Sequence, residues 1–332
     1  MTTSSSVAHL TRVTSSAMPD EAEAMFQWQY LSFVQPHLDA NMLSAINNQM
    51  MMHPQSNPLQ DSVNVMKNNY SPRILSKNAA YFRQITPDKI IKVWNAEFGN
   101  PADFLFILTG NIDEAEAKRL VCQYLASMPT KKPSNRNYVD VSVAPKMKHQ
   151  DKDVRVPLQQ SLVIGVASFD LRGAFSEKEA LANKLIEQVF QSRLMENIRQ
   201  KEGGVYAIQA HGETNYLPTG SLEISAEYQA SPADVKRIQQ KIIGEWKNMV
   251  QAGISVGEMD RVANFLKLKV VQDNRKAETW AESLATQYLC GRQVLTPMSS
   301  RPLLATLTLA DINALLKKYE QQGTSMSVVF QP

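Results

Sequence analysis

An internal repeat constrains the fold of this chain more than any other feature of its sequence. The segment ITPDKIIKVWNAEFGNPADFLFIL, which starts at Ile85, aligns without gaps with LTLADINALLKKYEQQGTSMSVVF, which starts at Leu307. Upstream of each copy, FVQPHLDANM at Phe33 resembles MVQAGISVGEM at Met249, with one residue inserted. Two blocks that recur in the same order at such a long spacing indicate duplicated domains and not a solenoid, whose repeats are about 20–50 residues long.

Both copies of the repeat predict the same local structure, a capped helix followed by a short loop and an apolar strand. In the first copy, Thr86 precedes Pro87, and proline is favoured at the first position of a helix. The segment Phe104–Thr109, FLFILT, is almost wholly apolar and predicts a strand. In the second copy, a helix over Leu307–Tyr319 precedes a closing strand over Ser325–Phe330.

The two copies differ in what precedes them, and this difference predicts an incomplete first domain. The second copy follows a strand at Val156–Phe169, a long helix that begins at Glu177, and a strand meander that ends at Gln229. The first copy has almost nothing in the corresponding place. We therefore expect this chain to be a fragment of a longer protein.

These patterns predict an α+β fold with two tandem domains, of which only the second is complete. Residues 1–133 should be mainly helical, with Phe104–Thr109 as the principal strand, and residues 134–150, rich in Lys, Pro and Asn, should form a linker. Residues 151–332 should form an antiparallel-rich sheet packed on helices. The helices expected in the first part cover residues 19–36, 39–52, 59–69, 85–98 and 114–127.

Composition excludes several classes of protein. A hydrophobic content of 43% and a charged content of 20% are typical of a globular protein, and a net charge of +3 without a basic block makes nucleic acid an unexpected partner. No apolar run reaches the length of a membrane span, and the first residues lack the pattern of a signal peptide. Two cysteines, Cys122 and Cys290, are too few for a disulfide framework, and we expect each to be a small buried apolar residue.

The segment Phe190–Ala210, FQSRLMENIRQKEGGVYAIQA, carries the candidate functional residues. It predicts the end of a helix, a stop at Gly203-Gly204 and then a strand, because glycine takes the left-handed conformation that ends a helix. This corner should bring Arg199 and Tyr206 to one edge, where a guanidinium and a phenol could hold a carbonyl oxygen or an oxyanion. The alternative is a solvated arginine and a half-buried strand tyrosine.

The sequence RLMENIRQKEGGVYAIQA resembles a segment of the pitrilysin and insulin-degrading-enzyme family, the inverzincins. In that family an Arg and a Tyr seven residues apart, in the last domain of the C-terminal half, assist a zinc site of the N-terminal half. Arg199 and Tyr206 keep this spacing, although Gly204 stands where the family often has Leu. The resemblance implies tandem metallopeptidase-like domains: the later part of the third family domain in residues 1–133 and the complete fourth domain in residues 151–332.

The zinc motif of the resembling family, H-x-x-E-H, does not occur in this sequence. No two of the histidines lie three or four residues apart, whereas a zinc centre needs three protein ligands and an open position. The sequence also lacks G-x-S-x-G, a P-loop and G-x-G-x-x-G. We therefore expect this chain to bind no metal and to hydrolyse no peptide alone. The histidines are His9, His37, His53, His149 and His211.

The resemblance implies that this chain is the C-terminal part of a zinc peptidase. Its partners would be a zinc-bearing N-terminal half of the same protein and an extended peptide, held by Arg199 and Tyr206. The alternative is a non-catalytic partner or scaffold subunit of the same fold; a free-standing peptide-binding domain is a third reading, disfavoured by the incomplete first domain. Resemblance to bacterial family members favours a periplasmic location, and a cytoplasmic one stays open.

Overall fold

The chain divides into two compact units. The computed structural model describes residues 2–7, 10–52, 82–134, 148–155, 163–201, 204–217, 220–291 and 293–331. Unit 1 comprises Met1–Ser56 and Leu75–Val139, and unit 2 comprises Asn57–Ile74 and Asp140–Pro332. The boundary at residues 139/140 lies within the segment predicted as a linker. The helix predicted over residues 59–69 lies outside the described residues.

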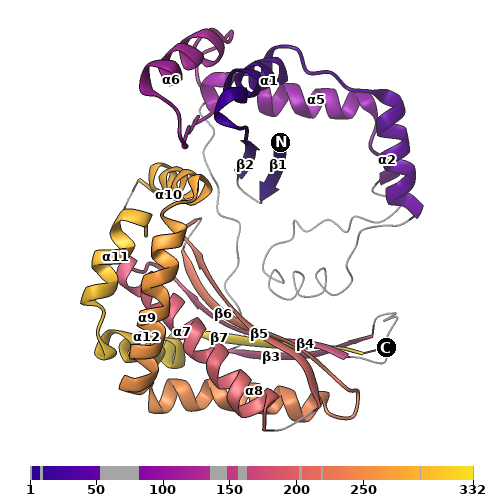
Figure 1. Ribbon diagram of the computed structural model, residues 1–332. Coiled ribbons are helices and arrows are strands. Elements are labelled where there is room, and N and C mark those ends of the chain that lie inside the picture. Colours follow the sequence, from indigo (N-terminus) through magenta and orange to yellow (C-terminus); the bar gives the residue numbers. More distant parts are fainter. Residues whose placement is uncertain are drawn as a thin grey trace. The chain divides into compact units, whose positions relative to one another are not determined.

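Unit 2 contains a five-stranded sheet with the strand order β3-β7-β4-β6-β5. The β3–β7 pair is parallel and the other three pairs are antiparallel, so the predicted antiparallel-rich sheet is confirmed. Figure 1 shows the helices of this unit gathered on one side of the sheet. The strands are β3 (His149–Arg155), β4 (Val163–Arg172), β5 (Val205–Asn215), β6 (Ser221–Ala230) and β7 (Thr324–Gln331).

The strand predicted over Val156–Phe169 is confirmed from Val163 on, because β4 covers Val163–Arg172, and residues 156–162 lie outside the described part. The preceding strand β3 was not predicted. The segment HQDKDVR of β3 carries no apolar alternation, so its sequence gives no sign of a strand. Its pairing with β7, from His149 opposite Ser325 to Arg155 opposite Gln331, makes it one.

The main core of unit 2 lies between the sheet and the helices. Gly165 of β4 shows how closely the side chains pack, because a Cβ at this position would lie 2.1 Å from Cζ of Tyr228 on β6. Trp246 stacks on Phe169 with ring centroids 4.3 Å apart and meets Phe190 edge-on at 5.4 Å. The helices are α7 (Glu177–Arg193), α8 (Val235–Ala252), α9 (Val256–Asp273), α10 (Ala277–Cys290), α11 (Pro297–Thr306) and α12 (Leu309–Gln322), and the π-helical segment η4 (Leu194–Arg199) continues α7.

Unit 1 is mainly helical, as predicted. Three of its helices begin at caps that the sequence indicates: the side chains of Asp39, Thr86 and Asp113 each accept a hydrogen bond from the backbone of the first turn. Its elements are the hairpin β1 (Thr2–Val7) and β2 (Leu10–Ser15), η1 (Pro19–Glu21), α1 (Ala22–Val34), α2 (Ala40–Met52), α5 (Pro87–Phe98), η2 (Pro101–Asp103), α6 (Glu114–Leu120) and η3 (Val121–Leu125).

The prediction of a strand at Phe104–Thr109 is wrong. The helices of the two repeat copies match at their caps, since Thr86 accepts from Lys89 N as Thr308 accepts from Asp311 N. Phe104 is extended, with φ −107° and ψ 144°, but no residue of the segment belongs to a sheet in the described part of the chain. An apolar sequence favours a strand, yet the strand exists only when a neighbour supplies hydrogen bonds. The duplication is thus supported by its helices, whereas the described structure does not show the strand expected in the first copy.

The expectation of buried cysteines is also wrong. Cys122 is exposed and Cys290 is partly exposed. Leu120 is the buried residue of α6, and Cys122 follows it by two positions, which places it on the opposite face of the helical turn.

Candidate functional site

The helix that leads to the candidate site is held at its start by its own sequence. Ser176 and Glu179 form a capping box at the N-terminus of α7, with Ser176 Oγ accepting from Glu179 N at 3.1 Å. The predicted apolar face is confirmed, because all of its members are at most 1% exposed. They are Leu185, Ile186, Val189, Phe190, Leu194 and Ile198.

An ion pair fixes this helix against α9. Arg193 Nε donates to Glu258 Oε1 at 2.7 Å, and Arg193 Nη2 donates to Glu258 Oε2 at 3.0 Å and to the carbonyl oxygen of Gly253 at 3.1 Å. The hydrogen bonds from Arg193 lower the pKa of Glu258 to about 2 against the opposing effect of burial, and Ser255 adds to the lowering. Sequence reasoning missed this ion pair, although the capping pattern Ser255–Glu258 is a local signal that places a carboxylate at the start of α9.

Arg199 lies at the end of the π-helical segment η4 and is exposed. Its Nη1 contacts Met195 Sδ at 4.0 Å, and within the described residues the guanidinium forms no ion pair. A π-helical turn widens the helix by one residue per turn and occurs frequently at functional sites. The guanidinium therefore retains its other donors for another molecule.

The turn between helix and strand depends on glycine, as predicted. Gly204 has φ +73°, and a Cβ there would lie 2.7 Å from Asp234 Oδ2. Asp234 itself is fixed, since it accepts hydrogen bonds from Ser231 Oγ at 2.7 Å and Arg237 Nη2 at 2.9 Å, which together lower its pKa. A larger residue at position 204 would thus strain the backbone and displace this carboxylate. Residues 202 and 203 lie outside the described part.

Tyr206 is the extra residue of a β-bulge. Val205 pairs with Ala230 and Ala207 with Gln229, which leaves Tyr206 without an opposite residue in β6. Its side chain is 58% exposed, more than the half-buried tyrosine of the alternative interpretation, and no hydrogen bond holds its hydroxyl within the described residues. A bulge re-aims a side chain and is common next to active sites. The sequence gives no sign of this bulge.

In the structure, Arg199 and Tyr206 flank the turn between the helical segment η4 and strand β5. Arg199 ends the helical arm and Tyr206 begins the strand arm, with the left-handed Gly204 between them. Gln191 Oε1 accepts from Ala210 N at 2.6 Å and ties the strand to α7. Two exposed donors on a braced corner can bind an oxygen that carries or develops negative charge.

The residues that the structure describes do not form a zinc centre. Within the described ranges no three His, Cys, Asp or Glu side chains are grouped to hold a metal ion. His149 lies on β3 and contacts Ser325 and Asp151, and His211 lies apart from it on β5. His9 and His53 are outside the described residues. No described helix is both long and apolar enough to cross a membrane.

Comparison with known proteins identifies relatives by sequence model and by fold. The family model described as Peptidase M16 inactive domain matches residues 84–266. No curated protein matches this sequence. The periplasmic protease PqqL from Escherichia coli has a similar structure, with a TM-score of 0.77 and 15% identity over 100% of this chain and 37% of PqqL.

Two further solved structures extend the comparison. A peptidase M16 inactive domain from Pseudomonas fluorescens has a TM-score of 0.76 and 17% identity, covering 96% of this chain and 77% of that one. Pitrilysin has a TM-score of 0.69 and 14% identity, covering 99% of this chain and 35% of pitrilysin. This chain thus spans little more than a third of the length of the proteases PqqL and pitrilysin.

Proposed function

Because the chain belongs to the Peptidase M16 inactive domain family, with a pitrilysin-like fold, we propose that it is the substrate-positioning C-terminal part of a zinc-dependent peptidase. The metal centre would lie in an N-terminal half that this chain does not include. Zinc would activate water there, and the part played by this chain is to bind and orient the peptide.

The observation that carries the proposal is the pair of exposed donors at the helix–glycine–strand corner. Within the described residues the hydroxyl of Tyr206 has no partner and the guanidinium of Arg199 has only the 4.0 Å contact with Met195 Sδ, whereas Arg193 donates to Glu258 from both Nε and Nη2. Buried polar groups normally find partners within the fold, whereas exposed donors such as these remain available to water or to a ligand. Side chains left free on an irregular, braced backbone indicate a ligand.

In the proposed role, the two side chains contact the peptide group that is to be cleaved. Tyr206 would donate its phenolic proton to the carbonyl oxygen, and Arg199 would offer its planar fork to the same oxygen or to the neighbouring backbone carbonyl. Both bonds would strengthen as negative charge develops on that oxygen, so they would lower the barrier more than they tighten substrate binding.

The proposal is tested by measuring zinc content and peptide hydrolysis in two preparations, this chain alone and this chain combined with the N-terminal half of its parent protein. We expect neither zinc nor hydrolysis in the first, and one zinc per complex with hydrolysis in the second. One tight zinc in this chain alone, lost on substitution of a histidine, contradicts the proposal. A stable complex that never hydrolyses peptides supports the scaffold alternative.

A further inference from the structure

One stripe along α7 is polar, whereas the buried side chains beside it are apolar. Asn183, Glu187 and Gln191 follow one another at four-residue spacing, so they lie on the same side of the helix, about one turn apart. Asn183 is fully buried, and Glu187 and Gln191 are partly buried. Polar side chains that are withdrawn from water are expected to find partners within the fold, and the partners of these three lie on one strand.

The first and last residues of this stripe bind the backbone of β5. Asn183 Nδ2 donates to the carbonyl oxygen of Glu213 at 3.2 Å, and Gln191 Oε1 accepts from Ala210 N at 2.6 Å. Because β5 is an edge strand, an N–H that points away from β6 has no neighbouring strand to bind. The side chain of Gln191 supplies the acceptor that such a strand would have supplied.

The middle residue of the stripe, Glu187, lies against Gly212 of β5. The N–H of Gly212 donates to its carboxylate, and a Cβ at position 212 would lie 2.9 Å from Glu187 Oε2 and 3.0 Å from Glu187 Cβ. Burial raises the pKa of the Glu187 carboxyl, so this contact lies in a place withdrawn from water. Helix and strand therefore approach each other so closely here that a side chain on the strand would push them apart.

The spacing of these contacts matches the geometry of both elements. The contacted peptide groups lie between residues 213 and 214, 211 and 212, and 209 and 210, so each step covers two residues of β5 and four residues of α7. Four residues of an α-helix rise about 6 Å, and two residues of a strand rise about 6.5 Å. Because the two steps are nearly equal, α7 and β5 lie side by side in opposite directions with one fixed register.

Continued toward the turn, this register leads to the candidate site. The next residues of the stripe are Met195 and Arg199, and Arg199 Nη1 contacts Met195 Sδ at 4.0 Å. Two further steps along β5 from Ala210 lead to the peptide group between Val205 and Tyr206. The π-helical turn adds one residue to the helix and the β-bulge adds one residue to the strand, so the two irregularities offset each other.

We propose that Asn183, Glu187 and Gln191 are positioning residues that fix the register of β5 on α7 and thereby hold Tyr206 beside Arg199. None of the three touches the peptide. They keep the phenol and the guanidinium within reach of one oxygen atom of the substrate. Their effect on turnover rests on the proposed function, whereas the register is a property of this chain alone.

Gln191→Met tests the contact nearest to the site, because methionine keeps the length of the side chain and offers Ala210 N only a weak acceptor. In the complete peptidase we expect kcat to fall at least about tenfold with KM within about twofold, since the substrate keeps its contacts and loses their alignment. Gln191→Glu keeps an acceptor oxygen and should restore kcat to within about threefold of the wild type. A folded Gln191→Met variant with wild-type kcat, or a Gln191→Glu variant as impaired as Gln191→Met, overturns the proposal.

A second measurement follows the register without any turnover. A fluorotyrosine at position 206 of this chain alone should give one fluorine NMR resonance, which we expect Gln191→Met to broaden or split while the melting temperature falls by only a few degrees. An unchanged resonance in Gln191→Met overturns the proposal. If the resonance changes but Tyr206→Phe in the complete peptidase keeps wild-type turnover, the register stands and the proposed function fails.

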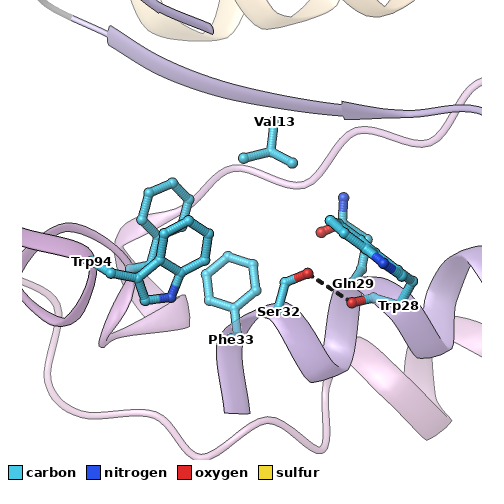
Figure 2. A pocket seen from close by; sticks show the side chains of 7 residues that line it. Val13, Trp28, Gln29, Ser32, Phe33 and Trp94 are labelled. Atoms are coloured by element: carbon cyan, nitrogen blue, oxygen red, sulfur yellow. Dashed lines mark hydrogen bonds between the residues drawn. The ribbon is translucent and has the colours of Figure 1, made fainter. Parts of the chain in front are cut away.

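Gln29→Met is the matched control in unit 1. Gln29 lines a pocket of that unit together with Val13 and Trp28 (Figure 2), and its Nε2 donates to Ser15 Oγ at 2.9 Å. The substitution removes a glutamine hydrogen bond between a helix and a strand, as Gln191→Met does, and it should leave kcat, KM and the fluorine resonance unchanged. Equal losses in Gln29→Met and Gln191→Met would show a general loss of fold and overturn the positioning role.

Discussion

The side chain of Tyr206 leaves the sheet because β5 contains one residue more than β6 at this point. A tyrosine in regular register would lie on one face of the sheet and pack there, as Tyr228 does in the core at 1% exposure. The bulge instead presents a neutral phenol to solvent at the end of the strand, next to a turn that only glycine tolerates.

We predict that Tyr206→Phe in the complete peptidase lowers kcat by about 10²–10³ with little change in KM, because one oxyanion donor typically contributes that much. The melting temperature should not change, since the hydroxyl forms no bond in the described structure. Tyr288→Phe is the matched control, because Tyr288 is 71% exposed on α10, away from the corner. Unchanged turnover in Tyr206→Phe would remove this residue from the mechanism.

Arg199→Lys keeps the charge and removes the planar fork, so it separates shape from charge. We expect a fall in kcat/KM of at least about tenfold, since an ammonium cannot make the same bidentate contact. Arg301→Lys, at an exposed arginine of α11, should leave kcat/KM unchanged. If the two lysine variants behave alike, Arg199 is a solvated surface residue.

A substitution at Gly165 tests how tightly the core between the sheet and the helices is packed. Gly165→Ala should lower the free energy of unfolding by about 1–3 kcal/mol, because the new methyl group collides with the ring of Tyr228. Gly244→Ala in α8 should instead raise it by about 0.5–1 kcal/mol, since nothing lies within 4 Å of that position and alanine favours a helix. Urea denaturation of both variants checks the opposite signs.

Helices α7 and α9 are joined at the element scale by Arg193 and Glu258. Because the folded-state pKa of Glu258 is about 2, below its ordinary value of 4.5, the pair stabilises the fold above about pH 4.5, and the contribution disappears as the pH falls toward 2. Glu258→Gln should therefore cost about 1.5–3 kcal/mol at pH 7 and little at pH 2. Chemical denaturation across this range measures the difference, with Glu278→Gln at an exposed position as control; a cost independent of pH would show that packing, not charge, is lost.

An element could be predicted from the sequence when the residues that determine it lie within the element itself. Helices α5, α6, α7 and α12 carry caps and apolar periodicity within their own residues, and they were predicted within a few positions. The helix α11 was missed because Pro302 lies inside it. Strand β3 and the bulge at Tyr206 depend on partner strands, and local sequence does not encode them. The positions of Arg199 and Tyr206 along the chain were foreseeable, whereas the π-helical turn that ends at Arg199 was not.

The two units differ in the number of apolar residues that they bury. In the described part of unit 1 the buried apolar residues are few, namely Phe26, Phe98, Pro101, Leu120 and Met128. In unit 2, two clusters of apolar side chains include residues from every strand of the sheet, and the larger cluster also includes residues of the helices. Since burial of apolar surface is the main force that offsets chain entropy, the units should differ in autonomous stability.

We predict that residues 140–332 expressed alone fold cooperatively, and that residues 1–139 expressed alone do not. Calorimetry should show one transition for the first fragment, close to that of the same unit in the whole chain. The second fragment should melt without a cooperative heat peak and should bind ANS, because its aromatic residues lack a covering layer. Its helices should remain visible by circular dichroism, since the caps at Thr86 and Asp113 are local. If residues 1–139 give a sharp transition and no ANS binding, unit 1 is a complete domain, and the interpretation of this chain as a fragment with an incomplete first domain fails.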